Sequence, residues 1–161
     1  MNTIIHPIDP VYDENSRILI LGSFPSVKSR EQGFFYGHPQ NRFWRVLAGI
    51  IGCDVPITID EKKRFLLENN IALWDVIHSC EIEGSADSSI KNAVPNDIGD
   101  MIAKSNIQCV FTNGKTADKL YKQYIEPRIN FKAVCLPSTS PANAAWSLER
   151  LIEYWGKEIE L

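Results

Sequence analysis

The sequence lacks a long apolar stretch, a secretory leader and a basic charge balance. No apolar run approaches the roughly 20 residues that a membrane-spanning helix needs, and residues 1–15 are polar with several acidic side chains. The formal net charge of −3 excludes an extended basic surface that coats nucleic acid, although it allows contacts to a few phosphates. We therefore expect a cytoplasmic protein that makes no membrane contact.

The sequence also lacks closely spaced cysteines. Its four cysteines are far apart and form no C-x-x-C pair, and its three histidines do not cluster. They are Cys53, Cys80, Cys109 and Cys135. Such spacing is unusual for a metal or iron–sulfur site, so the sequence predicts buried free thiols, no metal and no cofactor.

Common nucleotide-binding and hydrolase motifs are missing as well. Neither G-x-G-x-x-G nor G-x-S-x-G occurs. Gly114-Lys115-Thr116 looks like the end of a phosphate-binding P-loop, but Cys109 stands where that loop needs its first glycine. The sequence therefore argues against a P-loop.

What is present is enough for one domain with a substantial core. The chain has 161 residues, of which 44% are hydrophobic, and it contains no repeat, linker or low-complexity tract. We expect a single domain over residues 1–161 that acts as a monomer.

Apolar runs and helical periodicity alternate along the chain. Short apolar runs predict strands at 18–21, 71–76, 109–112 and 133–136. Helical spacing predicts helices at 41–51, 60–68, 98–104, 115–124 and 142–159. The polar, serine-rich segment 78–96 is expected to be a loop or the rim of the active site. Strands separated by helices indicate an α/β protein, a three-layer α/β/α sandwich with a central four-stranded parallel sheet.

Polar turns follow each predicted strand. They lie at 22–26, 78–83, 113–115 and 137–143. Ligands of parallel sheets bind beyond the carboxyl ends of the strands, so we expect these turns to form one site.

The segment 34–45 (FFYGHPQNRFWR) combines aromatic rings, amides and two arginines in a short loop. Aromatic rings stack on bases, and Arg and Asn contact phosphates or base edges. The same basic residues would equally suit a solvated charged face. We expect His38 to fix the loop by hydrogen bonding, and Trp44 and Trp146 to pack helices onto the sheet.

Two other polar elements allow alternative interpretations. Asn113 at a strand end either caps the following helix or contacts a base edge. The hydroxyl-rich turn 137–143 either caps the long last helix or binds phosphate through hydroxyls and backbone N–H groups.

These segments together resemble the uracil-DNA glycosylase superfamily. Gly22-Ser23-Phe24-Pro25-Ser26 occupies the place of its first motif, and 37–44 (GHPQNRFW) is similar to the H-P-x-N-R-F-W stretch of the mismatch-specific enzymes. Residues 136–140, followed by 147–151, resemble the second motif and the helix after it. Phe24 stands where most members have an Asp or Asn that activates water, and Ser138 replaces the His or Asn of the second motif. With Asn-Gly-Lys at 113–115, this combination most resembles the deoxyinosine (hypoxanthine)-DNA glycosylase branch.

The resemblance implies a role for each matching residue. Asn41 and Asn113 are the catalytic candidates, Tyr36 is expected to stack on the flipped base, and Phe24 and Ser23 are expected to complete the base pocket. The residues expected to contact DNA are Ser26, Arg42, Ser138, Ser140, Pro141, Ala142 and Asn143.

The implied function is base-excision repair by a DNA-deoxyinosine glycosylase, which hydrolyses the N-glycosidic bond of hypoxanthine flipped out of damaged DNA. We expect the cleft to use amides and to contain no acidic side chain that drives the water. Two alternatives stay open: a mismatch-specific uracil/thymine-DNA glycosylase, and a catalytically silent module that binds lesion DNA.

Overall fold

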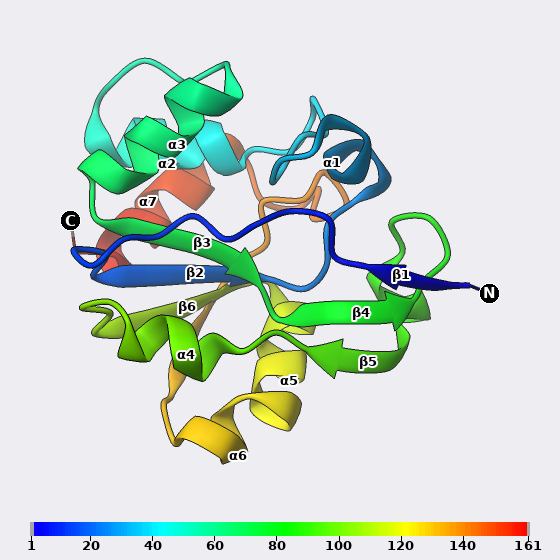
Figure 1. Ribbon diagram of the computed structural model, residues 1–161. Helices are drawn as coiled ribbons and strands as arrows, with labels where there is room; N and C mark the ends of the chain where they lie inside the picture. The colour runs from blue at the N-terminus through cyan, green and yellow to red at the C-terminus, as the bar shows by residue number, and fades with distance from the viewer. Residues whose placement is uncertain (1, 161) are drawn as a thin grey trace.

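A central parallel sheet organises the protein. The computed structural model describes residues 2–160 and contains strands β2 (Ile18–Gly22), β3 (Ile71–Asp75), β6 (Cys109–Asn113) and β7 (Ala133–Leu136). The order across the sheet is β3-β2-β6-β7, and every neighbouring pair is parallel (Figure 1). The predicted four-stranded parallel sheet is confirmed.

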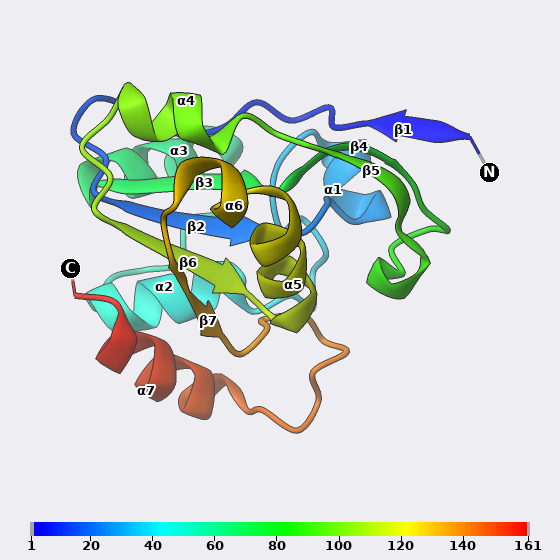
Figure 2. The same ribbon diagram turned by 90° about the horizontal axis from the view of Figure 1, so that it is seen from below.

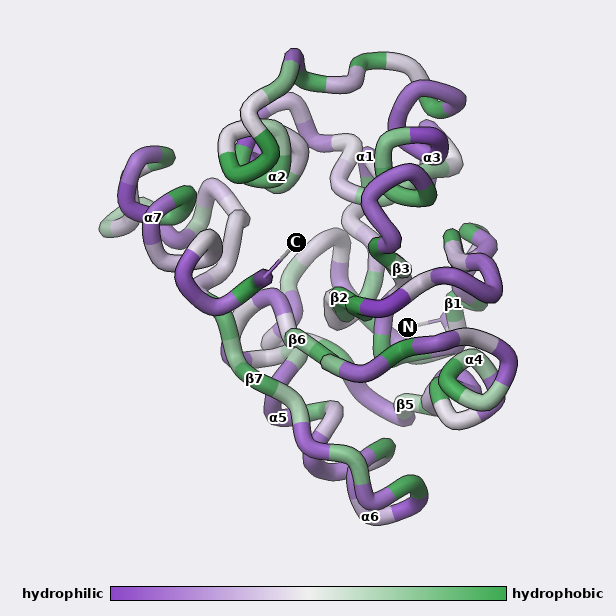
Figure 3. Tube along the Cα trace, turned by 90° about the vertical axis from the view of Figure 1, so that its left-hand side faces the viewer, coloured by the Kyte–Doolittle hydropathy of each residue, from purple (hydrophilic) through white to green (hydrophobic). Residues whose placement is uncertain are grey.

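Helices cover both faces of this sheet. One face carries α2 (Phe43–Ile51), α3 (Ile59–Glu68) and α7 (Leu148–Glu158). The other carries α4 (Ile98–Ala103), α5 (Lys115–Tyr124) and the short α6 (Glu126–Ile129). The end-on view in Figure 3 shows the two helical layers on either side of the strands. The expected three-layer sandwich is therefore confirmed.

The core consists of two apolar clusters, one on each face of the sheet. Alternate residues of β2 belong to different clusters. Ile18 and Ile20 pack in the cluster on the α2 side, and Leu19 and Leu21 pack in the cluster on the α5 side. All five residues of β2 are buried, which is expected for a central parallel strand covered on both faces.

Parallel pairing brings the strand ends to a common edge. Gly22 is the register partner of Asp75, and Asn113 is the partner of Leu136. Figure 2 shows the arrowheads of β2 and β6 directed toward the same side of the molecule. The polar turns after β2, β6 and β7 are thus held close together, whereas most of the predicted turn at 78–83 belongs to strand β4 (Ile77–Glu81).

The expected loop over 78–96 is wrong. β4 (Ile77–Glu81) and β5 (Lys91–Pro95) form a second, antiparallel sheet with the N-terminal β1 (Thr3–Ile5), in the order β1-β4-β5. Between β4 and β5 lies a 3-10 turn, η1 (Asp87–Ser89). The strands escaped prediction because their polar residues obscure the apolar periodicity on which strand prediction depends.

The last helix is shorter than predicted. It begins at Leu148 because the Ser147 hydroxyl accepts a hydrogen bond from the N–H of Arg150. The residues before it form turns. In one of these turns the N–H of Asn143 donates a hydrogen bond to the carbonyl of Ser140. A further helix, α1 (Val27–Gln32), was not predicted because it is short and polar; Ser26 caps its start and Gly33, with φ of 74°, ends it.

The cysteines differ in solvent exposure, although all four were expected to be buried. Among the described residues all four cysteines are free, but only Cys80 is buried, whereas Cys53 and Cys109 are exposed. Within residues 2–160, no helix is long and apolar enough to cross a membrane.

Candidate active site

A pocket of about 380 Å³ lies beyond the carboxyl ends of the parallel strands. Each of β2, β3 and β6 contributes its last residue (Gly22, Asp75 and Asn113), and the turn after β7 contributes residues 138–142. The aromatic loop and the η1 region complete the wall. The size and the mixed lining suit a small, partly polar ligand.

The pocket gathers most of the residues that the sequence singled out. Tyr36, Asn41 and Asn113 line it together, although they lie on different segments. The other predicted residues in its wall are Ser23, Phe24, Ser26, Ser138, Ser140, Pro141 and Ala142. Asn143 lines a neighbouring groove that shares part of this wall, and Arg42 lies behind the turn.

The two asparagines are joined through Thr139, which is fully buried. Asn113 Nδ2 donates to Thr139 Oγ1 (3.0 Å), and the N–H of Thr139 donates to Asn113 Oδ1 (3.1 Å). The Thr139 hydroxyl then donates to Asn41 Oδ1 (2.8 Å), which also accepts the N–H of Phe43 (2.9 Å). A backbone N–H can only donate, so both amide oxygens are fixed by these bonds.

This chain leaves donors available. Asn41 Nδ2 has no hydrogen-bond partner within residues 2–160, and Asn113 Nδ2 uses one of its two N–H groups on Thr139. Asn113 does not cap the next helix: α5 starts after Gly114 without a side-chain cap. The capping alternative for Asn113 is therefore excluded.

Tyr36 has an unusual backbone and an unsatisfied hydroxyl. Its φ is 53°, a left-handed conformation that is uncommon for a bulky residue and costs about 1–3 kcal/mol. The ring stacks on Phe43, with centroids 4.1 Å apart. The hydroxyl is buried and has no partner among the described residues. Burial, and then the charge of Asp75, raises the pKa of Tyr36, while the nearby Asn113 amide opposes the shift, so the hydroxyl remains protonated.

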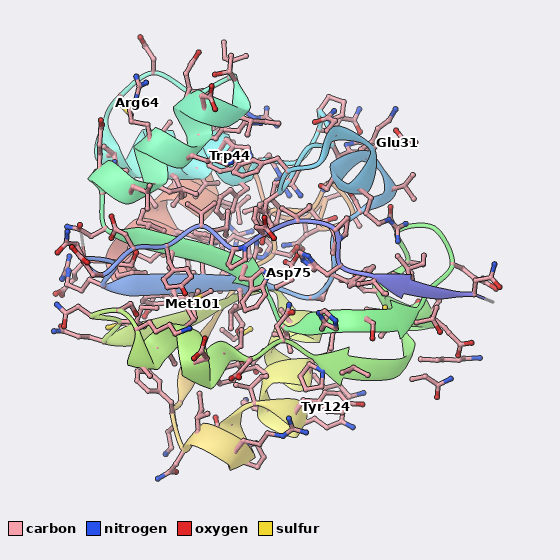
Figure 4. The ribbon with its side chains drawn as sticks, viewed as in Figure 1. Glu31, Trp44, Arg64, Asp75, Met101 and Tyr124 are labelled. Atoms are coloured by element: carbon pink, nitrogen blue, oxygen red, sulfur yellow. The ribbon has the colours of Figure 1, made fainter. Side chains whose placement is uncertain are left out.

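The expectation of a cleft without acidic side chains is wrong. Asp75, the last residue of β3, lines the pocket and is almost fully buried. Figure 4 labels it near the centre of the molecule, at the tip of β3. Its Oδ2 accepts a hydrogen bond from His6 Nε2 (2.8 Å), while His6 Nδ1 accepts the N–H of Ile8 (3.2 Å). A backbone N–H can only donate, so Nδ1 is the acceptor in this contact and Nε2 is the donor to Asp75.

A second carboxylate, Asp87 of η1, approaches from the opposite sheet. The residue is exposed overall, yet its Oδ1 accepts the hydroxyl of the buried Ser23 (2.9 Å). Burial of the carboxylate raises the pKa of Asp87, the Ser23 hydrogen bond lowers it, and the charge of Asp75 raises it further. Sequence inspection did not single out either acid, because their partners His6 and Ser23 lie 69 and 64 residues away in the chain. Only the segment that contains Asp87, residues 78–96, was expected near the site.

Arg42 fastens the second-motif turn. Its guanidinium donates to the carbonyls of Thr139 (3.3 Å), Ser140 (2.9 Å) and Asn143 (3.1 Å), and also to that of Trp146. These bonds direct Arg42 inward, so its predicted phosphate contact would have to compete with them.

The other basic residues near the aromatic loop also bind carbonyl groups. Arg30 donates to Gly84 (2.9 Å) and lies over the Phe24 ring, and Arg45 donates to Gln40. Arg30 and Arg42 therefore fasten loops, whereas Lys28, which pairs with Glu31, and Arg45 are exposed, as the alternative of a solvated charged face predicts.

The remaining predicted contacts lie at the pocket mouth. Ser26 binds within α1, Ser138 Oγ accepts the N–H of Ser140, and Asn143 Nδ2 donates to the carbonyl of Ser138 (3.0 Å). Pro141 and Ala142 are exposed. His38 Nδ1 accepts the N–H of Gln40, the structural role that we expected for it.

The tryptophans differ in burial. Trp44 is 5% exposed and donates to the carbonyl of Phe35, as expected of a packing residue. Trp146 is partly buried and carries the Arg150 guanidinium over its ring at 4.1 Å. No group of three His, Cys, Asp or Glu side chains in the described chain could hold a metal ion.

A comparison with protein-family models shows which family the chain belongs to. Residues 10–157 match the family described as the uracil DNA glycosylase superfamily, and the chain belongs to it. The similarities of the chain to individual proteins are more specific than this family match. A hypoxanthine DNA glycosylase of Methanosarcina acetivorans is 38% identical over 148 residues, which cover 89% of this chain and 91% of that protein. A protein of the same description from Methanosarcina barkeri is 38% identical over 83% and 85% of the two chains.

A solved structure agrees with these similarities. The solution NMR structure of a candidate uracil DNA glycosylase from Methanosarcina acetivorans matches with a TM-score of 0.79 and 34% identity, and the match covers 94% of each chain. The predicted superfamily and its fold are thus confirmed.

Proposed function

We propose that this chain is a hypoxanthine DNA glycosylase, which hydrolyses the bond between hypoxanthine and deoxyribose in DNA. The observation that carries the proposal is the Asn41–Thr139–Asn113 chain, which presents amide donors to a pocket that Tyr36 also lines. The relatives described as hypoxanthine DNA glycosylases support it.

Hypoxanthine suits the donors of this pocket. Like guanine, it carries O6 and N7 as acceptors. The second N–H of Asn113 Nδ2 and the Tyr36 hydroxyl are donors that have no partner within the described chain. Phe43 supports one face of the Tyr36 ring, and the base stacks on the other, for about 1–3 kcal/mol.

The same donors favour departure of the base. Breaking the glycosidic bond leaves negative charge on the purine, and donors fixed before the reaction stabilise that charge without reorganising. The free group of Asn41 is an amide N–H, so Asn41 acts by donating to the base.

The base reaches the pocket by flipping out of the duplex, which costs a few kcal/mol and least for a mispaired base. The exposed Pro141-Ala142 tip fills the gap left behind, and Ser26, Ser138 and Ser140 contact the adjacent phosphates. The protein acts as a monomer in the cytoplasm.

An excision assay tests the proposal. Duplexes that each contain one inosine, uracil or xanthine, and an undamaged duplex, are incubated with the protein, and abasic sites are cleaved with alkali. We expect cleavage of the inosine duplex at a rate at least tenfold above the others. Preferred cleavage at uracil would instead support a mismatch-specific enzyme, and binding without any cleavage would support a silent module.

A further inference from the structure

Phe24 cannot activate water, yet the pocket contains a buried acid in the next strand. Phe24 follows β2 by two residues, whereas Asp75 ends β3 beside it, in register with Gly22. Asp75 is 3% exposed as a residue and lines the pocket. A carboxylate is therefore present at the end of the strand next to the one that Phe24 follows.

The two oxygens of Asp75 have different environments. Oδ2 is held by His6 Nε2 at 2.8 Å. Oδ1 has no hydrogen-bond partner within residues 2–160, and Asp75 lines the pocket. A Cβ added at Gly22 would lie only 2.4 Å from Oδ1 and 2.8 Å from the Tyr36 hydroxyl, so the glycine lets the carboxylate and this hydroxyl approach the end of β2 closely.

We propose that Asp75 is the general base that holds and deprotonates the attacking water, and that His6 positions it. This inference rests on the proposed function, because the reaction is hydrolysis of the deoxyinosine bond. Asp75 is a catalytic residue in it, since Oδ1 touches the water. His6 acts only through Asp75.

The step conserves atoms and charge. A lone pair of the water oxygen forms a bond to C1′ of the sugar, and the C1′–N9 bond breaks with its electron pair going to the purine. One water proton passes to Asp75 Oδ1, and the purine, held by amide donors, takes up a proton from solvent. Asp75 then returns its proton to solvent. The products are hypoxanthine and an abasic site.

The surrounding groups support this division of roles. His6, Tyr36 and Asp87 are titratable groups that face Asp75, from the segment after β1, the aromatic loop and η1 respectively. Burial keeps the Tyr36 hydroxyl protonated, and His6 donates to Oδ2 of Asp75. The carboxylate of Asp87 is held by the Ser23 hydroxyl on an otherwise exposed residue, whereas Asp75 is almost fully buried and its Oδ1 is left as an acceptor in the pocket.

Asp75→Asn tests the role with little change in shape. The new side chain keeps the His6 bond by presenting its oxygen to Nε2–H, which turns an N–H donor toward the pocket in place of Oδ1. We expect the single-turnover rate on an inosine duplex to fall at least about 100-fold, with duplex affinity within about threefold of wild type by fluorescence anisotropy. A general base must be unprotonated to act, so the wild-type rate should fall at acidic pH, and this acidic limb should vanish in the variant.

A matched control is Asp118→Asn. Asp118 is also buried and hydrogen-bonded, to Thr112 at 3.0 Å, but it lies on α5 away from the pocket residues. We expect the control to keep the wild-type rate and pH profile. A second variant, His6→Gln, keeps a donor for Asp75 but loses the ring; its rate should fall by a smaller factor and its acidic limb should shift.

The outcomes separate this inference from the proposed function. If the wild type does not excise hypoxanthine, both are overturned. If the wild type excises it and Asp75→Asn retains the full rate and the acidic limb, only the role of Asp75 is overturned. Should Asp75→Asn fail to fold by circular dichroism, His6→Gln decides: a wild-type rate and pH profile would refute the inference, and a shifted limb would support it.

Discussion

The pocket has two walls of different chemistry. On one side, Asn41, Thr139 and Asn113 are neutral, and hydrogen bonds within the protein fix their orientation. On the other, Asp75 and Asp87 are carboxylates held by His6 and Ser23. A neutral wall of donors suits a leaving base, whereas an acidic wall would repel that anion and suits the water and the positive sugar. The difference indicates that base binding and water activation are divided between the two walls.

The largest effect should come from removing the neutral wall. Asn41→Ala should lower the single-turnover excision rate by about 10²–10³-fold, the usual result of losing one fixed donor to a developing anion. Rapid-quench kinetics on an inosine duplex would measure this. Asn15→Ala, at an exposed asparagine, serves as the control.

Asn41→Asp sharpens that test. The aspartate retains an oxygen for the N–H of Phe43 and the Thr139 hydroxyl, but it replaces the amide donor. We expect it to be as inactive as Asn41→Ala. Activity near the wild-type level would show that the oxygen, and not the N–H, is what matters.

Thr139→Val should have the next largest effect. The substitution removes the hydroxyl that joins Asn113 to Asn41, so both amides lose their fixed orientation. We expect a 10- to 100-fold slower rate together with a loss of about 1–3 kcal/mol in the free energy of unfolding. Urea denaturation and the same kinetic assay measure the two quantities. Thr116→Val on α5 is the matched control, and an unchanged rate in Thr139→Val would mean that the asparagines act independently.

Tyr36→Phe should separate stability from activity. The Tyr36 hydroxyl is buried without a partner among residues 2–160, so its removal should raise the melting temperature. The variant loses a donor to the purine, and excision should slow about tenfold, by about 1.4 kcal/mol. A variant that is both less stable and fully active would contradict this view of the pocket.

Arg42→Gln tests whether Arg42 serves structure or phosphate binding. Glutamine cannot span the four carbonyls, so we expect a loss of about 2 kcal/mol in stability. If Arg42 makes no phosphate contact, the slope of log affinity against log salt should stay the same. A slope reduced by about one unit would instead support the contact predicted from the sequence.

Asp87→Asn should have the smallest effect. Because the pKa of Asp87 is raised in the folded protein, the folded state binds the proton more tightly than the unfolded chain does. Its ionisation therefore destabilises the protein as pH rises from the unfolded pKa through the raised folded one. Asp87→Asn should raise the melting temperature at pH 7 by about a degree or two, and should have no such effect at a pH below both values. An equal gain at both pH values would exclude ionisation as the cause.

The neutral wall could be predicted from the sequence, and the acidic wall could not. Asn41, Asn113 and the turn at 137–143 stand in local motifs, and the resemblance of those motifs to the superfamily implied their place in the site. The pairing of Asp75 with His6 depends on the register between β2 and β3 and on the path of the N-terminal segment. Neither is visible as local periodicity. The signal available was an acid at the end of a predicted buried strand, a place where ligands of parallel sheets bind.

The same reason explains the errors in the fold. The four strands of the parallel sheet stand out as apolar runs, most clearly β2 and β3, which are almost wholly buried, so they were predicted correctly. β4 and β5 lie in a second sheet and contain too many polar residues for their pairing to be recognised. Thr139 was missed for a related reason, because its importance comes from two partners far away in the sequence.

The clamp formed by Arg42 has a consequence for motion. One guanidinium ties the start of α2 to the carbonyls of residues 139, 140, 143 and 146, so the turn and the helix must shift as one body. The width of the entrance is then set before any nucleotide arrives, and the duplex, rather than the protein, has to deform for a base to enter.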